Sequence, residues 1–199
     1  MESLEEILSE CERLHGHMCA GQLLVARMAL LGCRLVGLED PRGADRTKTI
    51  VWVEIDRCMA DAVSAATGVR LGKRSLKYVD YGKVAATFLN TATKQAVRLV
   101  ARESSRALAD ERFSSIANKR ERQFRAYSEA TDEELFSSEF VRLELSEMDA
   151  PGSPRSRVTC AVCNEGVNDG RQVVRADGTV VCRSCSGESY YKKVDNLRV

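Results

Sequence analysis

TIVWVEIDRCMADAVSAATG, residues 49–68, joins a predicted strand directly to a predicted helix. Apolar side chains occupy both faces of Thr49–Ile55, as in a central strand that is covered on each side. The alanine-rich segment Met59–Thr67 has helix-forming composition, and Gly68 provides its end. Cys58 falls at the junction of the two elements. The stretch therefore indicates a domain in which helices pack against a sheet.

The chain on either side of this stretch continues the two periodicities. Apolar residues at steps of three and four predict helices at 3–14 and 22–35, separated by a glycine-containing turn at 15–21. Short apolar segments downstream predict three strands, at Leu76–Tyr81, Ala85–Asn90 and Ala96–Arg102. A ragged apolar face predicts a helix over 103–128, and 132–145 predict an acidic helical turn followed by a strand, Val141 to Leu145. The order helix–strand–helix–strands indicates an α+β fold.

The composition is that of an ordinary globular protein, with 44% hydrophobic and 30% charged residues in a chain of 199. A formal net charge of +1 gives no electrostatic argument for binding nucleic acid or an anionic membrane. We interpret the basic run 119–122 as a solvated helix face. No apolar run approaches the ~20 residues of a membrane span, and the acidic amino terminus does not resemble a signal peptide. We therefore expect a cytoplasmic protein without a membrane partner.

Eight cysteines in such a chain indicate metal or redox chemistry, because the cytosol keeps thiols reduced. Cys11 and Cys33 fall on apolar helix faces, and we predict that both are core residues. Residues 149–157 contain two prolines and a glycine and form the predicted linker. The linker separates an α+β domain, 1–148, from a small domain, 158–199.

The small domain contains two Cys-x-x-Cys pairs that can supply four thiolates to one tetrahedral zinc ion, namely Cys160, Cys163, Cys182 and Cys185. Between the pairs, Asp177-Gly178 predicts a hairpin. Two knuckles and a hairpin predict a zinc ribbon or a treble-clef finger. A module of this size rarely builds a sufficient core, so structural zinc would supply much of its folding free energy. Two disulfides, or an iron site of the rubredoxin type, are the alternatives.

The two histidines of the chain lie together in HGHMCAG, residues 15–21. Alternate residues of this turn can point to one side, so His17 and Cys19 can reach one metal ion. Cys58 is the third candidate ligand, because a thiol at a helix amino terminus has a lowered pKa. Such a second zinc site would keep an open position for substrate chemistry, with His15 as a fourth ligand or as a partner of bound water. The alternatives are that the cysteines are packing residues or a redox pair.

Four sequence blocks resemble the family of formylmethanofuran dehydrogenase E subunits (FmdE). They are HGHMCAG at 15–21, DRCMADA at 56–62, TGVRLGK at 67–73 and DYGKVAATF at 80–88. The resemblance covers most of residues 1–145, and the four-cysteine module resembles an appendage that many members carry. It implies an α-β-α order followed by three strands, similar to the carboxyl-terminal domain of glyceraldehyde-3-phosphate dehydrogenase, and a homodimer.

The resemblance also implies a link to the molybdenum or tungsten enzyme that fixes carbon dioxide onto methanofuran. The chain has no pterin or iron–sulfur catalytic motif, so we expect an accessory at most and assign no catalytic residue. Some positions depart from the family. Ala20 stands where proline is usual, Val69 where many members have cysteine, and Arg74-Ser75 replaces a commoner Gly-Asn.

Three polar residues of these blocks are candidate ligand-binding residues. Lys73 and Lys83 each follow a glycine on a predicted turn, where they can meet an anionic ligand, and Asp80 lies nearby in the sequence. The alternative is that all three simply decorate turns.

Three functions agree with these observations. The first is a zinc-dependent accessory or enzyme-like protein that binds a small anionic ligand near Cys19 and Cys58. The second is a non-enzymatic dimeric module whose zinc finger docks a partner protein. The third is a carrier of metal or sulfur that uses the same two cysteines. Whether the chain is an enzyme is left open by its sequence.

Overall fold

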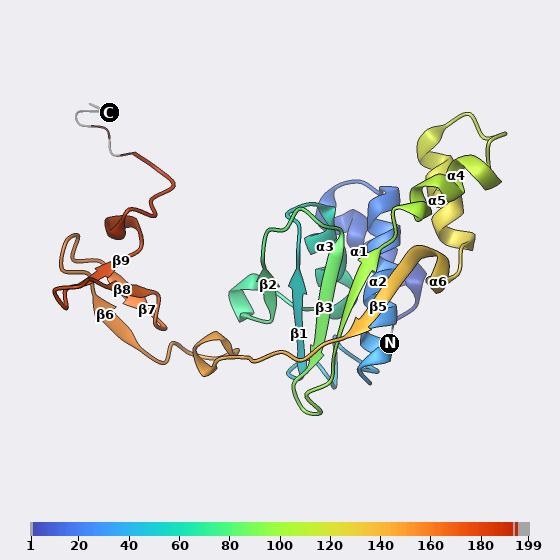
Figure 1. Cartoon of the computed structure of the whole chain (residues 1–199). Coiled ribbons are helices and arrows are strands. Elements are labelled where there is room, and N and C mark those ends of the chain that lie inside the picture. The colour runs from blue at the N-terminus through green and yellow to red at the C-terminus, as the bar shows by residue number, and fades with distance from the viewer. Residues whose placement is uncertain (1, 193, 195–199) are drawn as a thin grey trace. The chain divides into compact units, whose positions relative to one another are not determined.

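The strand predicted at 49–55 lies inside a five-stranded sheet of the computed structural model, which describes residues 2–192 and residue 194 (Figure 1). The strand order is β2-β1-β3-β4-β5, with β1 parallel to β2 and all other neighbours antiparallel. The strands are β1 (Thr49–Val53), β2 (Leu76–Tyr78), β3 (Ala85–Asn90), β4 (Ala96–Ala101) and β5 (Phe136–Phe140). This mixed sheet and its helices confirm the predicted α+β class.

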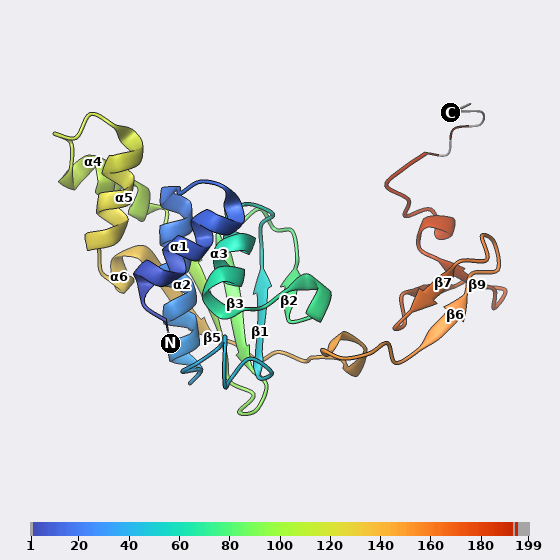
Figure 2. The same cartoon turned by 180° about the vertical axis from the view of Figure 1, so that it is seen from behind.

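The α-helices that precede or interrupt these strands are α1 (Leu4–His15), α2 (Ala20–Leu35), α3 (Cys58–Thr67), α4 (Ser104–Arg112), α5 (Lys119–Glu129) and α6 (Asp132–Leu135). Figures 1 and 2 show α1, α2 and α3 together on one face of the sheet. Helix α2 contacts α1, α3, β3 and β4, so it lies between the sheet and the other helices. Cys11 and Cys33 are buried in this core, as predicted. None of the described helices combines the length and the apolar character that crossing a membrane requires.

Local sequence signals set the ends of the first and third helices. Ser3 begins α1 through a capping box in which its hydroxyl accepts from the Glu6 amide and the Glu6 carboxylate accepts from the Ser3 amide. Gly16 ends α1 with φ of 84°, and Gly68 ends α3 with φ of 71°, both left-handed conformations that favour glycine. The turn after Gly16 is short, so α2 starts close to the end of α1.

A glycine allows α2 to approach the sheet closely. A Cβ atom on Gly32 would lie 2.3 Å from the ring of Phe88, which is fully buried on β3. This distance is far below van der Waals contact, so the ring occupies the space that any larger side chain on α2 would need.

The second face of the sheet is free of these three helices in both views (Figures 1 and 2). Ile50 is buried there and pairs in register with Leu89, whereas Trp52 is only partly buried. Further along, the Glu54 carboxylate accepts hydrogen bonds of 2.7 and 2.6 Å from Nε and Nη2 of Arg98. The expectation that helices cover β1 on each side is therefore wrong. Its apolar second face reflects one buried end of the strand, and the other end turns polar.

Two predicted elements also differ in the structure. The single helix expected over 103–128 is divided into α4 and α5 by residues 113–118, where the Asn118 side chain caps α5. The strand expected at Val141–Leu145 lies earlier, because β5 comprises the more polar segment 136–140. Backbone pairing with β4 decides this register, and alternation of apolar residues in a segment outside the sheet misled the prediction.

The chain divides into two compact units, 1–144 and 145–199. The second unit contains two antiparallel pairs, β6 (Arg157–Thr159) with β7 (Gly166–Asn168) and β8 (Gln172–Val174) with β9 (Val180–Cys182). The second pair is the hairpin predicted around Asp177-Gly178. The Asp169 carboxylate accepts from the amides of Arg155 and Ser156, so the end of the predicted linker segment is bonded within the second unit.

We expect Gly32→Ala to destabilise the first unit by about 1–3 kcal/mol, because the added methyl group overpacks the Phe88 contact. Urea unfolding followed by fluorescence of Trp52, the single tryptophan, measures this unit. Gly72→Ala is the matched control, since its Cβ would meet nothing within 4 Å, and it should change stability by less than about 0.5 kcal/mol. Equal stability of the two variants would contradict the close approach of α2 to β3.

Candidate metal and ligand sites

Cys19 is positioned by the start of α2. It is the residue before the helix, in an extended conformation, and its amide donates a 3.0 Å hydrogen bond to Oε1 of Gln22. Gln22 is fully buried and donates in turn to the carbonyl of Cys11 on α1. The polar core residue therefore links the end of α1 to the start of α2 and holds Cys19 in place.

Cys58 is the first residue of α3, and its sulfur lies 3.8 Å from that of Cys19. Two thiolates bound to one tetrahedral ion at a metal–sulfur distance of about 2.3 Å lie about 3.8 Å apart. Gly21 borders the pair, and a Cβ atom there would lie 3.2 Å from the Cys58 sulfur and 3.6 Å from the Cys19 sulfur. The absence of a side chain at position 21 leaves room beside both sulfurs, so the pair fits a metal ion sterically.

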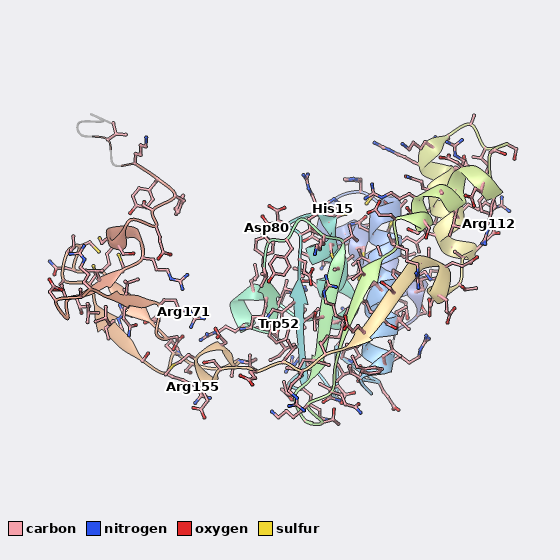
Figure 3. The ribbon with its side chains drawn as sticks, viewed as in Figure 1. His15, Trp52, Asp80, Arg112, Arg155 and Arg171 are labelled. Atoms are coloured by element: carbon pink, nitrogen blue, oxygen red, sulfur yellow. The ribbon has the colours of Figure 1, made fainter. Side chains whose placement is uncertain are left out.

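The histidines lie at the end of α1, where Figure 3 labels His15. Nδ1 of His15 lies 2.8 Å from a carboxylate oxygen of Asp61, one turn after Cys58 on α3. The exposed ring of His17 stacks at a tilt on His15, with ring centroids 4.8 Å apart. A carboxylate that accepts from Nδ1–H leaves Nε2 of the same ring as an electron-pair donor, an arrangement common among metal-bound histidines.

The N-terminal candidates are brought together only in part. Cys19 and Cys58 form a pair, but His17 does not complete a three-ligand cluster with them among the described residues. Burial, followed by the neighbouring Cys19, raises the pKa of the Cys58 thiol to about 11. The lowered pKa expected from its position at a helix amino terminus is therefore wrong, because removal from water outweighs the helix dipole in this packed junction.

The three candidate ligand-binding residues are exposed and lie apart from the cysteine pair. Lys73 ends a short 3-10 helix, η1 (Leu71–Lys73), and Asp80 accepts from the Gly82 amide in the loop after β2 (Figure 3). The Lys83 ammonium lies over the ring of Tyr81, 5.9 Å from its centroid. Of the three, only Lys83 lines a cavity beside the sheet, of about 230 Å³, which also contains Arg102 and Arg106.

A larger cavity of about 390 Å³ opens directly beside Cys58. Its lining includes Gly21 and Arg57, which belong to the sequence blocks described above, but also Arg106, Lys119 and Tyr127 from α4 and α5. Sequence reasoning missed the last three, since residues 103–128 have the pattern of an ordinary solvated helix. The folding back of α5 against α2 places them here, and the local sequence carries no signal of that contact.

The four cysteines of the second unit form a cluster whose sulfur atoms all lie within 4.8 Å of one another, in the part of the chain that the structure describes. Cys163 and Cys182, from different Cys-x-x-Cys pairs, are separated by 3.8 Å between sulfurs, the same spacing as in the first unit. The cluster contains only free thiols, so the two-disulfide alternative is not present. Four converging sulfurs match the donor set of a tetrahedral metal site.

Backbone amides point at these sulfurs and favour their ionised form. The Cys185 amide donates to the Cys182 sulfur at 3.4 Å. Similar bonds from Cys163 and Cys182 lower the pKa of Cys160 to about 6. A hydrogen bond with Cys182, together with burial, raises the pKa of Cys185 to about 12. Four adjacent thiols cannot all ionise easily by themselves, and a bound divalent cation removes this repulsion.

The second unit has very little apolar core to stabilise it without such an ion. Its buried cluster consists of Cys160, Val181 and Cys182, with partly buried neighbours that again include the other two cysteines. The metal ligands and the core are therefore largely the same residues.

Comparisons with known proteins agree with this geometry. Residues 14–138 match the family FmdE, described as molybdenum formylmethanofuran dehydrogenase operon. A "Probable S-adenosyl-L-methionine-binding protein" of Archaeoglobus fulgidus is 31% identical over 148 residues, which cover 74% of this chain and 36% of that relative. The chain thus matches about a third of the relative's length.

The fold also occurs in a solved structure. The crystal structure at 1.90 Å resolution of an FmdE-like protein of tungsten formylmethanofuran dehydrogenase from Syntrophus aciditrophicus is similar, with a TM-score of 0.63. The similarity covers 96% of both chains at 23% sequence identity. At this identity the comparison shows a shared fold.

We expect Cys160→Ser to unfold the second unit while the first unit stays folded, because the substitution removes a metal ligand from a unit with almost no other core. Amide hydrogen exchange measured by mass spectrometry should show lost protection over 157–185 and unchanged protection in α2 and β3. Ser186→Ala, in the same unit, is the control and should leave both regions protected. Loss of protection in both units together would contradict their independence.

Proposed function

The chain belongs to the FmdE family, and from this membership and its two groups of cysteines we propose that it is a zinc-binding accessory protein. Zinc suits the carboxyl-terminal site, because four thiolates at tetrahedral spacing are its usual structural donor set. A site closed by four protein ligands has no position for a substrate, so this ion is structural. An iron ion of the rubredoxin type would accept the same four donors, and elemental analysis distinguishes the two metals.

The second proposed zinc ion is held by Cys19 and Cys58, with a histidine of the HGHMCAG turn as the third ligand. The observation that supports this most is the 3.8 Å spacing of the two sulfurs beside a glycine that leaves room for an ion. Three protein ligands would leave an open position that faces the cavity lined by Cys58. This arrangement supports the binding of a small anionic ligand near the metal, and we assign no reaction to it.

The family name connects the chain to formylmethanofuran dehydrogenase, and we propose an accessory role in one-carbon chemistry of that kind, in the cytoplasm. A second candidate function is an interaction module in which the four-cysteine unit docks a partner protein. Its specific support is that Val162 and Val174 of this unit are 56% and 61% exposed. A carrier of metal or sulfur would use the Cys19–Cys58 pair without a bound organic ligand.

We expect two zinc ions per wild-type chain after mild chelation and reconstitution, falling to one in Cys19→Ala and in Cys58→Ala. Each variant loses one of three protein ligands, which costs more than the about 10-fold to 100-fold loss of affinity seen on removing a supporting residue. Cys33→Ala is the control, because this cysteine is buried in the core and should leave the count at two. Elemental analysis with one ion per chain in all proteins would sink the second site and leave the pair as redox or packing residues.

We also expect a homodimer formed through the first unit, with the helix-free face around Trp52 as the contact. Sedimentation should give twice the 22.0 kDa mass of the chain at micromolar concentration, and Trp52→Glu should shift it to the monomer. Val174→Glu, which places the same charge on the second unit, is the control. A wild-type monomer under these conditions would remove the proposal.

A further inference from the structure

The cavity beside Cys58 has an apolar interior. Its walls come from α2, from the junction of β1 and α3, and from α4 and α5. The apolar lining consists of Ala20, Leu24, Val25, Ile55, Met59, Val84 and Ala109. At about 390 Å³ the cavity lies in the lower part of the range that holds small organic ligands, roughly 300–1,000 Å³.

The same cavity carries an excess of positive charge. Arg57, Arg106 and Lys119 all contribute to its lining, and Arg57 and Lys119 have no ion-pair partner among the residues that the structure describes. The one carboxylate in the lining, Asp110, forms a 2.8 Å ion pair with Arg122, which offsets its charge. A ligand in this cavity therefore meets uncompensated cations.

The position of two of these cations is unfavourable for the helices themselves. Arg57 is the residue before α3, and Lys119 is the first residue of α5. The amino terminus of a helix carries partial positive charge and is stabilised by anions, so basic residues there oppose the local electrostatic preference. Residues that break a local rule without a structural gain are concentrated at functional sites. An anion between these two helix ends would be attracted by the side chains and by the helix dipoles together.

We propose that this cavity binds a small organic carboxylate with an apolar body. The carboxylate lies among Arg57, Arg106 and Lys119, and the apolar body lies against Leu24, Val25 and Ile55, beside Cys58. The inference rests on the proposed ligand-binding role of the N-terminal unit and gives that ligand its chemical class. The smaller cavity that contains Lys83 and Arg102 shares Leu24, Val84, Arg106 and Tyr127 with this one, so a longer ligand can extend toward Lys83.

Calorimetric titration of the full chain with hexanoate and with hexanamide tests this directly, because the two probes have the same apolar body and differ in charge. We expect saturable binding of hexanoate and at least ten-fold weaker binding of hexanamide. Acetate, which lacks the apolar body, should also bind at least ten-fold more weakly than hexanoate. Equal binding of hexanoate and hexanamide, or no saturable binding of hexanoate, overturns the proposal.

Variants then locate the site. Lys119→Gln and Arg57→Gln should each weaken hexanoate binding several-fold, and the double variant at least ten-fold, with no change for hexanamide, since a hydrogen bond to a charged group contributes about 1.5–3 kcal/mol. Arg120→Gln, which changes the adjacent residue of α5 outside the cavity lining, is the control and should bind like wild type. Hexanoate binding that is unchanged in the double variant places the ligand elsewhere and overturns the assignment.

Metal analysis of the same samples separates this inference from the proposed metal site. Lys119→Gln should keep the wild-type metal count while losing hexanoate affinity, and that result supports the cavity independently of the metal. Normal metal content in a wild type that does not bind hexanoate rejects the cavity inference alone. Hexanoate binding in a chain with one metal ion rejects the second zinc ion and leaves the cavity proposal standing.

Discussion

The packing of α2 between the sheet and the other helices is the constraint on which the first unit depends. Gly32 brings the helix against Phe88, and the buried face of α2 then supports both α1 and α3. Because α2 and α3 pack together with their amino termini at one end, Cys19 and Cys58 come within 3.8 Å despite being 39 residues apart in the chain. The same packing receives α5, which carries Lys119 and Tyr127 to the cavity next to Cys58. The candidate site is therefore a consequence of how one helix is held.

Much of this arrangement was accessible from the sequence. Periodicity identified the helices and the strands around the sheet, because one buried face per element leaves a regular pattern of apolar residues. The spacing of Cys160, Cys163, Cys182 and Cys185 identified the metal cluster, since each pair can form one turn with converging sulfurs. The HGHMCAG turn pointed to Cys19, and the strand–helix junction pointed to Cys58.

What the sequence did not contain was the information carried by long-range packing. The segment after the sheet alternates apolar and polar residues at 141–145, yet pairing with β4 selects 136–140 as β5. The raised pKa of Cys58 follows from burial between helices, which no local rule reports. Asp61 as the partner of His15, and the cationic residues of α4 and α5 beside Cys58, likewise depend on contacts between distant segments.

The two glycines that flank the HGHMCAG turn illustrate a further distinction. Gly16 has a left-handed backbone with open space where a side chain would be, whereas a side chain at Gly21 would meet the two sulfurs. The first is needed for the path of the chain, and the second for whatever lies between the sulfurs. In a lineage that had given up the metal, selection would keep glycine at position 16 and let position 21 drift to alanine or serine. The pair would thus serve as a fossil record, in which descendants that still handle the ion can be told from those that have only inherited its fold.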